Sequence, residues 1–566
     1  MKVSFPGSIT KPETQREIVK KGVKASFRGG VVYRHPDMPP MIEVSGSHYE
    51  MGLQYGVLLR PELVSALDSY QRVVRWLAGQ QETPYADILD MLMSSSARLA
   101  SRLPGRFLQE LQGMADGSGT PFDTVTALAL FYDVLMAKGC TGVLLRGEGG
   151  ALIHGRNNDS TSFGGQELAQ VVVIARHKPD GYNHVTHVDY LFWGGVETGY
   201  NNQGLSFSEE TLSVREPNPD GFSLPYLARM ALEECATLEQ LYPLFDSHPT
   251  VGAYGTVWGS RGQGTGMVAE LSPVGWSAIP LRGPLLWNFN HFYSPKLKSL
   301  QHPRVNLGAG NRDRESLAGS FPLQEGYSVE DAIHFLRLQV DAEQVNYAWS
   351  GSRWPICNQA GQQMMVFDPA GDGLYLSLAD SFAARRAIYH VHDDLALPPE
   401  PFMAAVPLPP VVEKVAEIEN RLLSGPDKLA AYVDLAAEYV EEANVHFILA
   451  WESLRAKRGD LFVKHAERAW ALAPAHADYR LFAGLAACRR QDMDKAIELL
   501  EGIEPVERFP EYELYRLFGL EAAWTPRDPK RAAHWARERE SVLQAHDAQE
   551  YFDQELRPSM EALFTN

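Results

Sequence analysis

A proline-rich segment divides the chain into two parts that differ in secondary structure. Residues 397–410 read LPPEPFMAAVPLPP, a composition typical of a linker, because proline lacks the backbone donor that helices and central strands need. Short strand-like runs end before this segment, and only helical patterns follow it. A chain of 566 residues also exceeds what one hydrophobic core usually organises. We therefore expect two or more domains, the last an all-α unit over residues 411–566.

The part before the linker changes its pattern near residue 140. Residues 41–139 are mainly helical, with apolar side chains at helical spacing. Short β-rich runs then appear, bounded by Gly, Asn, Asp and Pro; they are TGVLL, ALIHG, AQVVVIA, GLSFS, YGTVWGS, GMVAEL, PLLWNF, QQMMVFD and GLYLSLA. Two helical stretches, 224–235 and 329–339, interrupt these runs. The pattern predicts an α+β core of sheets covered by helices over residues 140–396, preceded by a mostly helical segment, 1–139.

The segment after the linker contains weak internal repetition. Residues 465–474 (HAERAWALAP) and 495–505 (KAIELLEGIEP) both place an alanine shortly before a proline, and DMDKA at 492–496 recurs as DPKRA at 528–532. This pattern resembles degenerate tetratricopeptide (TPR) helix pairs. A plain helical bundle is the alternative, and both interpretations predict a separate all-α unit.

Net charge limits the classes of partner. The formal charge is −19 at pH 7, which opposes binding to nucleic acid or to an anionic membrane surface. The first residues hold no apolar segment of the length that a secretory signal needs, and no run approaches a membrane span. We therefore expect a cytoplasmic protein that neither spans a membrane nor binds nucleic acid.

One of the four cysteines lies in an unusual context. Cys140, Cys235, Cys357 and Cys488 are far apart and show no CxxC pairing, so neither a disulfide framework nor a zinc site is indicated. Residues 139–159, GCTGVLLRGEGGALIHGRNND, predict a hairpin that turns at Gly147–Gly150. The outer ends of a hairpin lie side by side, so Cys140, Arg156 and Asp159 share one end of a sheet. A guanidinium beside a thiol favours the thiolate, and we expect a lowered thiol pKa.

This hairpin resembles the nucleophile hairpin of cysteine N-terminal-nucleophile (Ntn) hydrolases. The branch concerned contains acyl-coenzyme A:isopenicillin N acyltransferase, acid ceramidase and N-acylethanolamine acid amidase. The shared pattern is Cys140-Thr141, a hairpin, and then Gly-Arg-Asn-x-Asp at 155–159. Three further stretches resemble these proteins in the same order; they are GSHYEMGLQYG (46–56), GVETGYNNQGLSFSEETL (195–212) and NHFYSP (290–295), the last with Phe289 in place of the usual Thr. The resemblance covers about residues 41–395.

The resemblance implies a four-layer αββα Ntn-hydrolase fold and a nucleophile that becomes N-terminal. Self-cleavage between Gly139 and Cys140 would free the Cys140 α-amine, whose ordinary pKa of about 7.7–8.0 suits a general base. Asp159 would orient this amine and Arg156 would anchor charge beside the thiol. Asn290 would donate to the oxyanion.

Two further asparagines are candidates for the oxyanion or for substrate contact. Asn288 lies two residues before Asn290 on the same strand face, so the assignment between the two is open. Asn202 lies in the stretch 195–212.

A metal site is the weaker interpretation of two histidine groups. His184, His187 and Asp189 form one group, and His390, His392, Asp393 and Asp394 form the other. His390 and His392 can share a strand face, but no further ligand cluster stands out in the sequence. We expect no metal and no cofactor. Arg312 and Arg314 are interpreted as surface or cap residues. The Ser352-Arg353 and Cys357-Asn358 pairs resemble the position of a late Ser-Arg pair in the acyltransferase, but their register is ambiguous and neither receives a firm role.

The sequence thus predicts a self-processing enzyme that cleaves a linear amide C–N bond, or transfers its acyl group, through an acyl-Cys140 intermediate. Its substrate would be a small N-acyl amide or a peptide. The alternative is a TPR-type interaction protein whose Ntn-like domain is catalytically degenerate. The helical tail would serve a protein partner or self-association.

Overall fold

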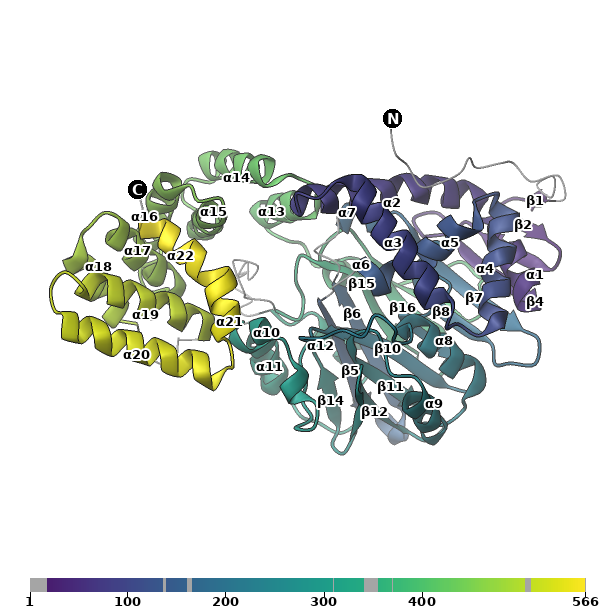
Figure 1. Ribbon diagram of the computed structural model, residues 1–566. Coiled ribbons are helices and arrows are strands. Elements are labelled where there is room, and N and C mark those ends of the chain that lie inside the picture. The colour runs from purple at the N-terminus through teal and green to yellow at the C-terminus, as the bar shows by residue number, and fades with distance from the viewer. Residues whose placement is uncertain are drawn as a thin grey trace.

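Two β-sheets form the centre of the protein (Figure 1). The computed structural model describes residues 18–135, 139–159, 165–308, 310–339, 355–368, 370–503 and 510–564. The larger sheet has eleven strands in the order β1-β2-β3-β4-β7-β8-β9-β10-β11-β12-β13. They span Val19–Lys21, Lys24–Phe27, Gly30–Tyr33, Met41–Gly46, Val172–Pro179, Val185–Tyr190, Thr198–Asn201, Leu205–Leu212, Ala253–Ser260, Thr265–Ser272 and Gly275–Pro280.

The smaller sheet has seven strands in the order β14-β5-β6-β15-β16-β17-β18. They span Leu285–Asn288, Gly139–Arg146, Leu152–Asp159, Gly361–Phe367, Gly373–Leu378, Ile388–His392 and Glu400–Met403. All nine strand-like runs predicted from the sequence lie on strands of these two sheets. Strand β18 lies inside the predicted linker, so the sheet continues into that segment.

Helices cover the outer face of each sheet. Helices α1 (His48–Leu58) and α8 (Leu224–Glu234) pack on the larger sheet, α12 (Val329–Leu336) packs on the smaller one, and β10 and β11 contact β5 between them. The predicted four-layer αββα arrangement is therefore confirmed. Strands β5 and β6 are almost wholly buried, because both of their faces are covered.

The segment before Cys140 is integrated into this core. Four of its strands, β1 to β4, extend the larger sheet, and β4 pairs in parallel with β7 from Met41↔Ile174 to Gly46↔Pro179. One hydrophobic core joins its helices to the strands that follow Cys140. Its remaining helices are α2 (Arg60–Gln80), α3 (Tyr85–Ala100), α4 (Gly105–Ser118), α5 (Phe122–Ala129) and α6 (Phe131–Leu135). The helical pattern was predicted, but the four short strands were not.

Helices α1 and α4 cross with their backbones in contact. A Cβ atom added at Gly52 would lie 1.9 Å from the Glu110 carbonyl oxygen, and one added at Gly113 would lie 2.1 Å from the Tyr49 carbonyl oxygen. Ser47 caps α1 in a capping box with Glu50. The stretch 46–56 thus has a structural role in helix initiation and close packing.

We expect Gly113→Ala to lower the free energy of unfolding by about 2–3 kcal/mol, because the added methyl group must push the two backbones apart. Gly79→Ala is the matched control, since a Cβ there meets nothing within 4 Å, and it should leave stability unchanged or slightly raised. Thermal unfolding monitored by circular dichroism measures both. Equal melting temperatures for the two variants would contradict the close-packing interpretation.

The tail after the linker consists of helices in successive packed pairs, drawn in green to yellow in Figure 1. They are α13 (Pro410–Asn420), α14 (Gly425–Glu438), α15 (Ala443–Arg455), α16 (Gly459–Leu472), α17 (Ala477–Arg489), α18 (Met493–Glu501), α19 (Pro510–Trp524), α20 (Pro529–Ala545), α21 (Gln549–Tyr551) and α22 (Arg557–Phe564). Helices α13 to α15 share a core with the smaller sheet and α12. The later helices form a core of their own. The all-α tail is confirmed, and its TPR-like character stays a prediction.

The remaining helices of the layered part lie at its edges; they are α7 (Gly165–Ala169), α9 (Tyr242–Ser247), α10 (Pro303–Leu307) and α11 (Gly310–Ser320). Across the described ranges, no helix combines the length and the apolar character that crossing a bilayer requires.

Candidate active site

Cys140 lies where the sequence predicted it, at the start of a hairpin. Strands β5 and β6 pair antiparallel, with Gly139 opposite Asp159, Cys140 opposite Asn158 and Gly142 opposite Arg156. Cys140 and Arg156 therefore share the face that is turned toward the larger sheet. The Cys140 side chain is fully buried.

Arg156 connects the thiol to the facing sheet. Its Nη2 group lies 3.3 Å from Cys140 Sγ and donates to Glu209 Oε1 at 3.0 Å. Its Nη1 group donates to the Glu197 carbonyl oxygen at 3.1 Å and to the Thr198 hydroxyl. The Arg156 and Glu209 side chains are both 0% exposed. The guanidinium is thus a fixed cation beside the sulfur atom.

Burial nevertheless controls the ionisation of this thiol. It raises the pKa of Cys140 to about 12; Arg156 opposes the rise, and the carboxylates of Glu209 and Asp159 add to it. The lowered pKa predicted from the Cys–Arg pair is therefore wrong for the uncleaved chain. The sequence shows the neighbouring cation, but not the removal of water around the sulfur.

The backbone of Cys140 is held by two side chains. Its N–H donates to Asn290 Oδ1 at 2.9 Å, and its carbonyl oxygen accepts from Arg314 Nη1 at 2.7 Å. The Asn290 Nδ2 group donates to the Thr211 carbonyl oxygen at 2.9 Å. Asn290 therefore contacts the candidate nucleophile, Cys140, directly.

Arg314 was interpreted from the sequence as a surface or cap residue, and this was wrong. It is 4% exposed and lies on α11, whose polar sequence GNRDRESLAGS gives no apolar pattern that would announce burial. The position of α11 beside strand β5 directs this guanidinium to the Cys140 carbonyl oxygen. In the sequence, the one indication of a role at the site was that Arg314 follows the stretch 290–295.

Asp159 lies beside the bond that self-cleavage would break, opposite Gly139. Its Oδ2 atom accepts from Asn358 Nδ2 at 2.8 Å, whereas no hydrogen-bond donor among the described residues reaches the buried Oδ1 atom. Burial raises the pKa of Asp159 to about 6, against the opposing effect of Arg314. Among the described residues, this carboxyl group thus keeps one oxygen without a donor beside the Gly139–Cys140 bond.

The other two candidate asparagines lie elsewhere. Asn288 Nδ2 donates to Glu210 Oε2 at 2.7 Å, so this side chain faces the larger sheet. Asn202 lies in the turn between β9 and β10, where its Oδ1 atom accepts the His184 N–H at 3.0 Å. The structure thus brings together five of the predicted site residues: Gly139, Cys140, Arg156, Asp159 and Asn290. Among the described residues, Asn202 makes no hydrogen bond to any of them.

Glu210 adds a buried carboxyl that the sequence did not single out. Burial raises its pKa to about 8, although Arg156 and Asn288 act in the opposite direction. In the unfolded chain its pKa is near the ordinary value of 4.5. Between these two values the folded protein holds one more proton than the unfolded chain. The contribution of Glu210 to the free energy of unfolding should therefore fall by about 1.4 kcal/mol per pH unit over this window.

We expect Glu210→Gln, which mimics the neutral form, to reduce this loss of stability. The drop in melting temperature between about pH 5 and about pH 8 should be smaller than in the parent protein. Thermal unfolding in a Cys140→Ala background keeps the cleavage state constant. Glu148→Gln, an exposed turn residue, is the matched control. An unchanged pH dependence in Glu210→Gln would show that this carboxyl is already ionised in the folded protein.

A cleft of about 480 Å³ opens next to this group of residues. Asn311 lines it, and its Nδ2 group donates to the Asn290 carbonyl oxygen at 3.2 Å. The lining also includes the cationic side chains Arg215, Lys298 and Arg312, together with residues at the end of α20. The cleft thus lies between the layered part and the tail, one residue away from Asn290.

The first histidine group is not a metal cluster. His187 and Asp189 are buried, with 3.4 Å between His187 Nδ1 and Asp189 Oδ2, whereas His184 is exposed near Asn202. Within the described part of the chain, one group of three or more His, Cys, Asp or Glu side chains has ligand-like spacing, and it lies on β16–β17. Ser352 and Arg353 fall outside the described residues.

Comparison with known proteins agrees with the motifs. The family model for acyl-coenzyme A:6-aminopenicillanic acid acyl-transferase matches residues 145–314. Protein dcd1A of Dictyostelium discoideum is 31% identical over 111 residues, 17% of this chain and 25% of that protein. Acid ceramidase of Rattus norvegicus is 32% identical over 85 residues, which is 15% of this chain and 21% of the ceramidase.

N-acylethanolamine-hydrolyzing acid amidase of Caenorhabditis elegans is 26% identical over 98 residues, 16% of this chain and 27% of the amidase. This chain thus spans about a quarter of the length of its curated relatives. The resemblance to the acyltransferase and acid ceramidase branch is confirmed by the family model and these relatives.

Two solved structures are also similar. The Caenorhabditis elegans amidase ortholog aligns with 41% of this chain and 93% of its own, at 16% identity and a TM-score of 0.28. A mutant form of conjugated bile acid hydrolase from Clostridium perfringens aligns with 48% of this chain and 99% of its own, at 8% identity and a TM-score of 0.29.

Proposed function

We propose that the protein is a self-processing cysteine Ntn hydrolase that acts on linear amides through an acyl-Cys140 intermediate. The observation that carries the proposal is the contact set of one residue. Cys140 is bound at its sulfur by Arg156, at its nitrogen by Asn290 and at its carbonyl oxygen by Arg314. A merely structural cysteine does not need such a set, because a buried free thiol packs as a small hydrophobe.

Self-cleavage begins with attack of Cys140 Sγ on the carbonyl carbon of Gly139. The Gly139–Cys140 C–N bond breaks, and the thiol proton passes overall to the departing nitrogen. Water then hydrolyses the thioester and releases the Gly139 carboxylate, the thiol and a free α-amine. Burial raises the pKa of this thiol to about 12, so the sulfur enters the step as the protonated thiol.

The free α-amine then acts as the general base of catalysis. Asn290 Oδ1 already lies 2.9 Å from the Cys140 nitrogen, and the open Oδ1 atom of Asp159 can accept a second bond from the new amine. Asn290 Nδ2 leaves the Thr211 carbonyl to donate to the oxyanion. An acyl-Cys140 thioester forms, the substrate amine leaves, and water or a second amine completes the cycle.

The cleft beside Asn290 indicates the kind of amide. Its lining holds Glu315 and an Arg215–Asp547 ion pair as well as the exposed Arg312 and Lys298. The remaining excess of positive charge favours a substrate that carries a carboxylate near the scissile bond. We propose an N-acyl amino acid or a short peptide. This choice rests on the charge of the cleft.

The test is to trap the acyl-enzyme. The protein is incubated with matched pairs of N-acyl amino acids and N-acyl amines, quenched in acid, and analysed by intact mass. We expect an acyl adduct on the chain that begins at Cys140, with carboxylate-bearing substrates reacting faster. If no substrate of either kind gives an adduct or a free amine while the protein is folded, the degenerate scaffold is the better description.

A further inference from the structure

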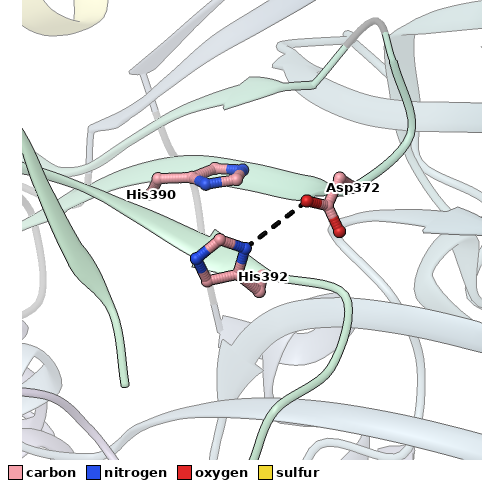
Figure 2. Close-up of side chains that lie close together, drawn as sticks. All are labelled: Asp372, His390 and His392. Atoms are coloured by element: carbon pink, nitrogen blue, oxygen red, sulfur yellow. Dashed lines mark ion pairs between the residues drawn. The ribbon is translucent and has the colours of Figure 1, made fainter. Parts of the chain in front are cut away.

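A second group of chemically active side chains lies on the outer edge of the smaller sheet, away from Cys140. Figure 2 shows His390 and His392 on β17, with the Asp372 carboxylate directed toward them from the turn before β16. The inward-facing neighbours Leu374, Leu376 and Val391 belong to the core between the sheets. The two histidines therefore lie on the opposite face.

Strand register brings these side chains together. His392 pairs with Gly373 and His390 with Tyr375, so both rings extend over β16. A Cβ atom added at Gly373 would lie 2.0 Å from the Val391 carbonyl oxygen, so glycine lets this turn approach the backbone of β17 closely. The Asp393 N–H donates to the Asp372 carbonyl oxygen at 3.1 Å and fixes the turn. On the other side, β18 places Glu400 opposite His390.

The pair His392–Asp372 has the spacing of two ligands around one ion, and two further carboxylates flank the rings. His392 Nδ1 lies 3.5 Å from Asp372 Oδ2, and His392 Nε2 lies 3.6 Å from Glu400 Oε1. His390 Nε2 lies 3.6 Å from Asp368 Oδ2. These separations exceed a normal hydrogen bond. A tetrahedral ion with bonds of about 2.0–2.2 Å holds its ligand atoms about 3.3–3.6 Å apart.

The Nε2 atoms of both rings lie beside the flanking carboxylates of Asp368 and Glu400, at 3.6 Å. Among the described residues, neither His390 Nε2 nor His392 Nε2 has a hydrogen-bond partner, although both atoms are buried. One ligand atom from each of Asp372, His390 and His392 lies within 4.8 Å of the other two. Asp372 is 65% exposed, so an ion can enter from solvent.

We propose that Asp372, His390 and His392 bind one divalent cation of the zinc class. Two imidazoles and a carboxylate suit Zn²⁺ or Co²⁺ better than Ca²⁺ or Mg²⁺, which prefer oxygen ligands alone. Asp368 and Glu400 flank the rings, each with a carboxylate oxygen 3.6 Å from an Nε2 atom, and would orient the rings when the ion is bound. The sequence interpretation without a metal lacked the third ligand, which the β15–β16 turn supplies from 18 residues before His390.

The ion would cross-link the turn before β16 to β17, next to the strand that leads into the tail. The ion would therefore stabilise this part of the sheet and would leave the reaction at Cys140 unchanged. Metal binding and amide cleavage can fail independently, which separates this proposal from the proposed function.

The test uses untagged full-length protein that has been stripped with a chelator and dialysed. It is titrated with ZnCl₂ by calorimetry and with CoCl₂ by visible absorption, and its bound zinc is counted by mass spectrometry. We expect about one ion per chain, tetrahedral Co²⁺ bands and a zinc-dependent rise in melting temperature. His392→Ala and His390→Ala should each weaken binding at least about tenfold.

His534→Ala is the matched control, because this histidine is 50% exposed, lies on α20 and has Glu538 as its neighbour. Its zinc affinity should equal that of the parent protein. Asp372→Asn keeps the test decisive if a histidine variant does not fold, since this exposed side chain can be neutralised without loss of the core. Absence of stoichiometric zinc, or equal affinity in parent, His392→Ala and Asp372→Asn, would overturn the proposal.

Discussion

Cys140→Ala should remain one chain of 63.0 kDa, whereas the parent protein should separate under denaturing conditions into chains 1–139 and 140–566. The reason is chemical, since alanine offers no atom that can attack the Gly139 carbonyl. Intact-mass measurement of both purified proteins decides the result. This is the largest effect that we expect, because it is all or none.

Cys488→Ala serves as the control for this experiment. It removes a second buried thiol, located in the core of the tail with its sulfur 3.4 Å from the Gly519 carbonyl oxygen, and it should be cleaved like the parent. An uncleaved parent protein would remove the support for an N-terminal nucleophile. Cleavage of Cys140→Ala at the same bond would assign the reaction to another group.

Arg156→Met should reduce self-cleavage and amide hydrolysis by at least about 100-fold, because the guanidinium in contact with the Cys140 sulfur is lost. The same change leaves the fully buried Glu209 carboxylate without its ion pair to Arg156. Breaking a buried pair in this way lowers the free energy of unfolding by about 3–5 kcal/mol. Single-turnover cleavage rates and thermal unfolding measure the two effects separately.

The double variant Arg156→Met/Glu209→Gln separates chemistry from folding. Neutralising Glu209 removes the buried charge that Arg156 had balanced, so the melting temperature should recover toward that of the parent. The cleavage rate should not recover. A double variant that is cleaved as fast as the parent would restrict Arg156 to a role in stability.

The local structure of the candidate site was predictable because it lies within one hairpin. The run from Gly139 to Asp159 contains two strand patterns and a glycine turn, and the observed register pairs Cys140 with Asn158 as this arrangement requires. The layered α+β core was predictable for a similar reason. Period-two and period-3.6 patterns alternate along the chain, and each is local.

What could not be predicted depends on contacts between distant segments. Arg314 lies 174 residues from Cys140 along the chain, and its hydrogen bond to the Cys140 carbonyl depends on how α11 packs. The thiol pKa likewise depends on burial under the larger sheet. The strands before residue 47 are short and contain polar residues, so their pairing with one another and the pairing of β4 with β7 decide their conformation more than their composition does.

The parallel pair β4–β7 affects whether the protein can refold after the proposed cleavage. Before cleavage, β4 and β7 belong to one chain and meet at a fixed effective concentration. After a cut at 139/140, the same pair joins two molecules, and Trp76 of α2 still donates to the Leu423 carbonyl of the tail at 2.9 Å. Reassembly then becomes second order and fails on dilution. A cleaved protein that has been unfolded by heat should not refold, whereas the Cys140→Ala precursor should, so the proposed self-cleavage would make folding a one-way event.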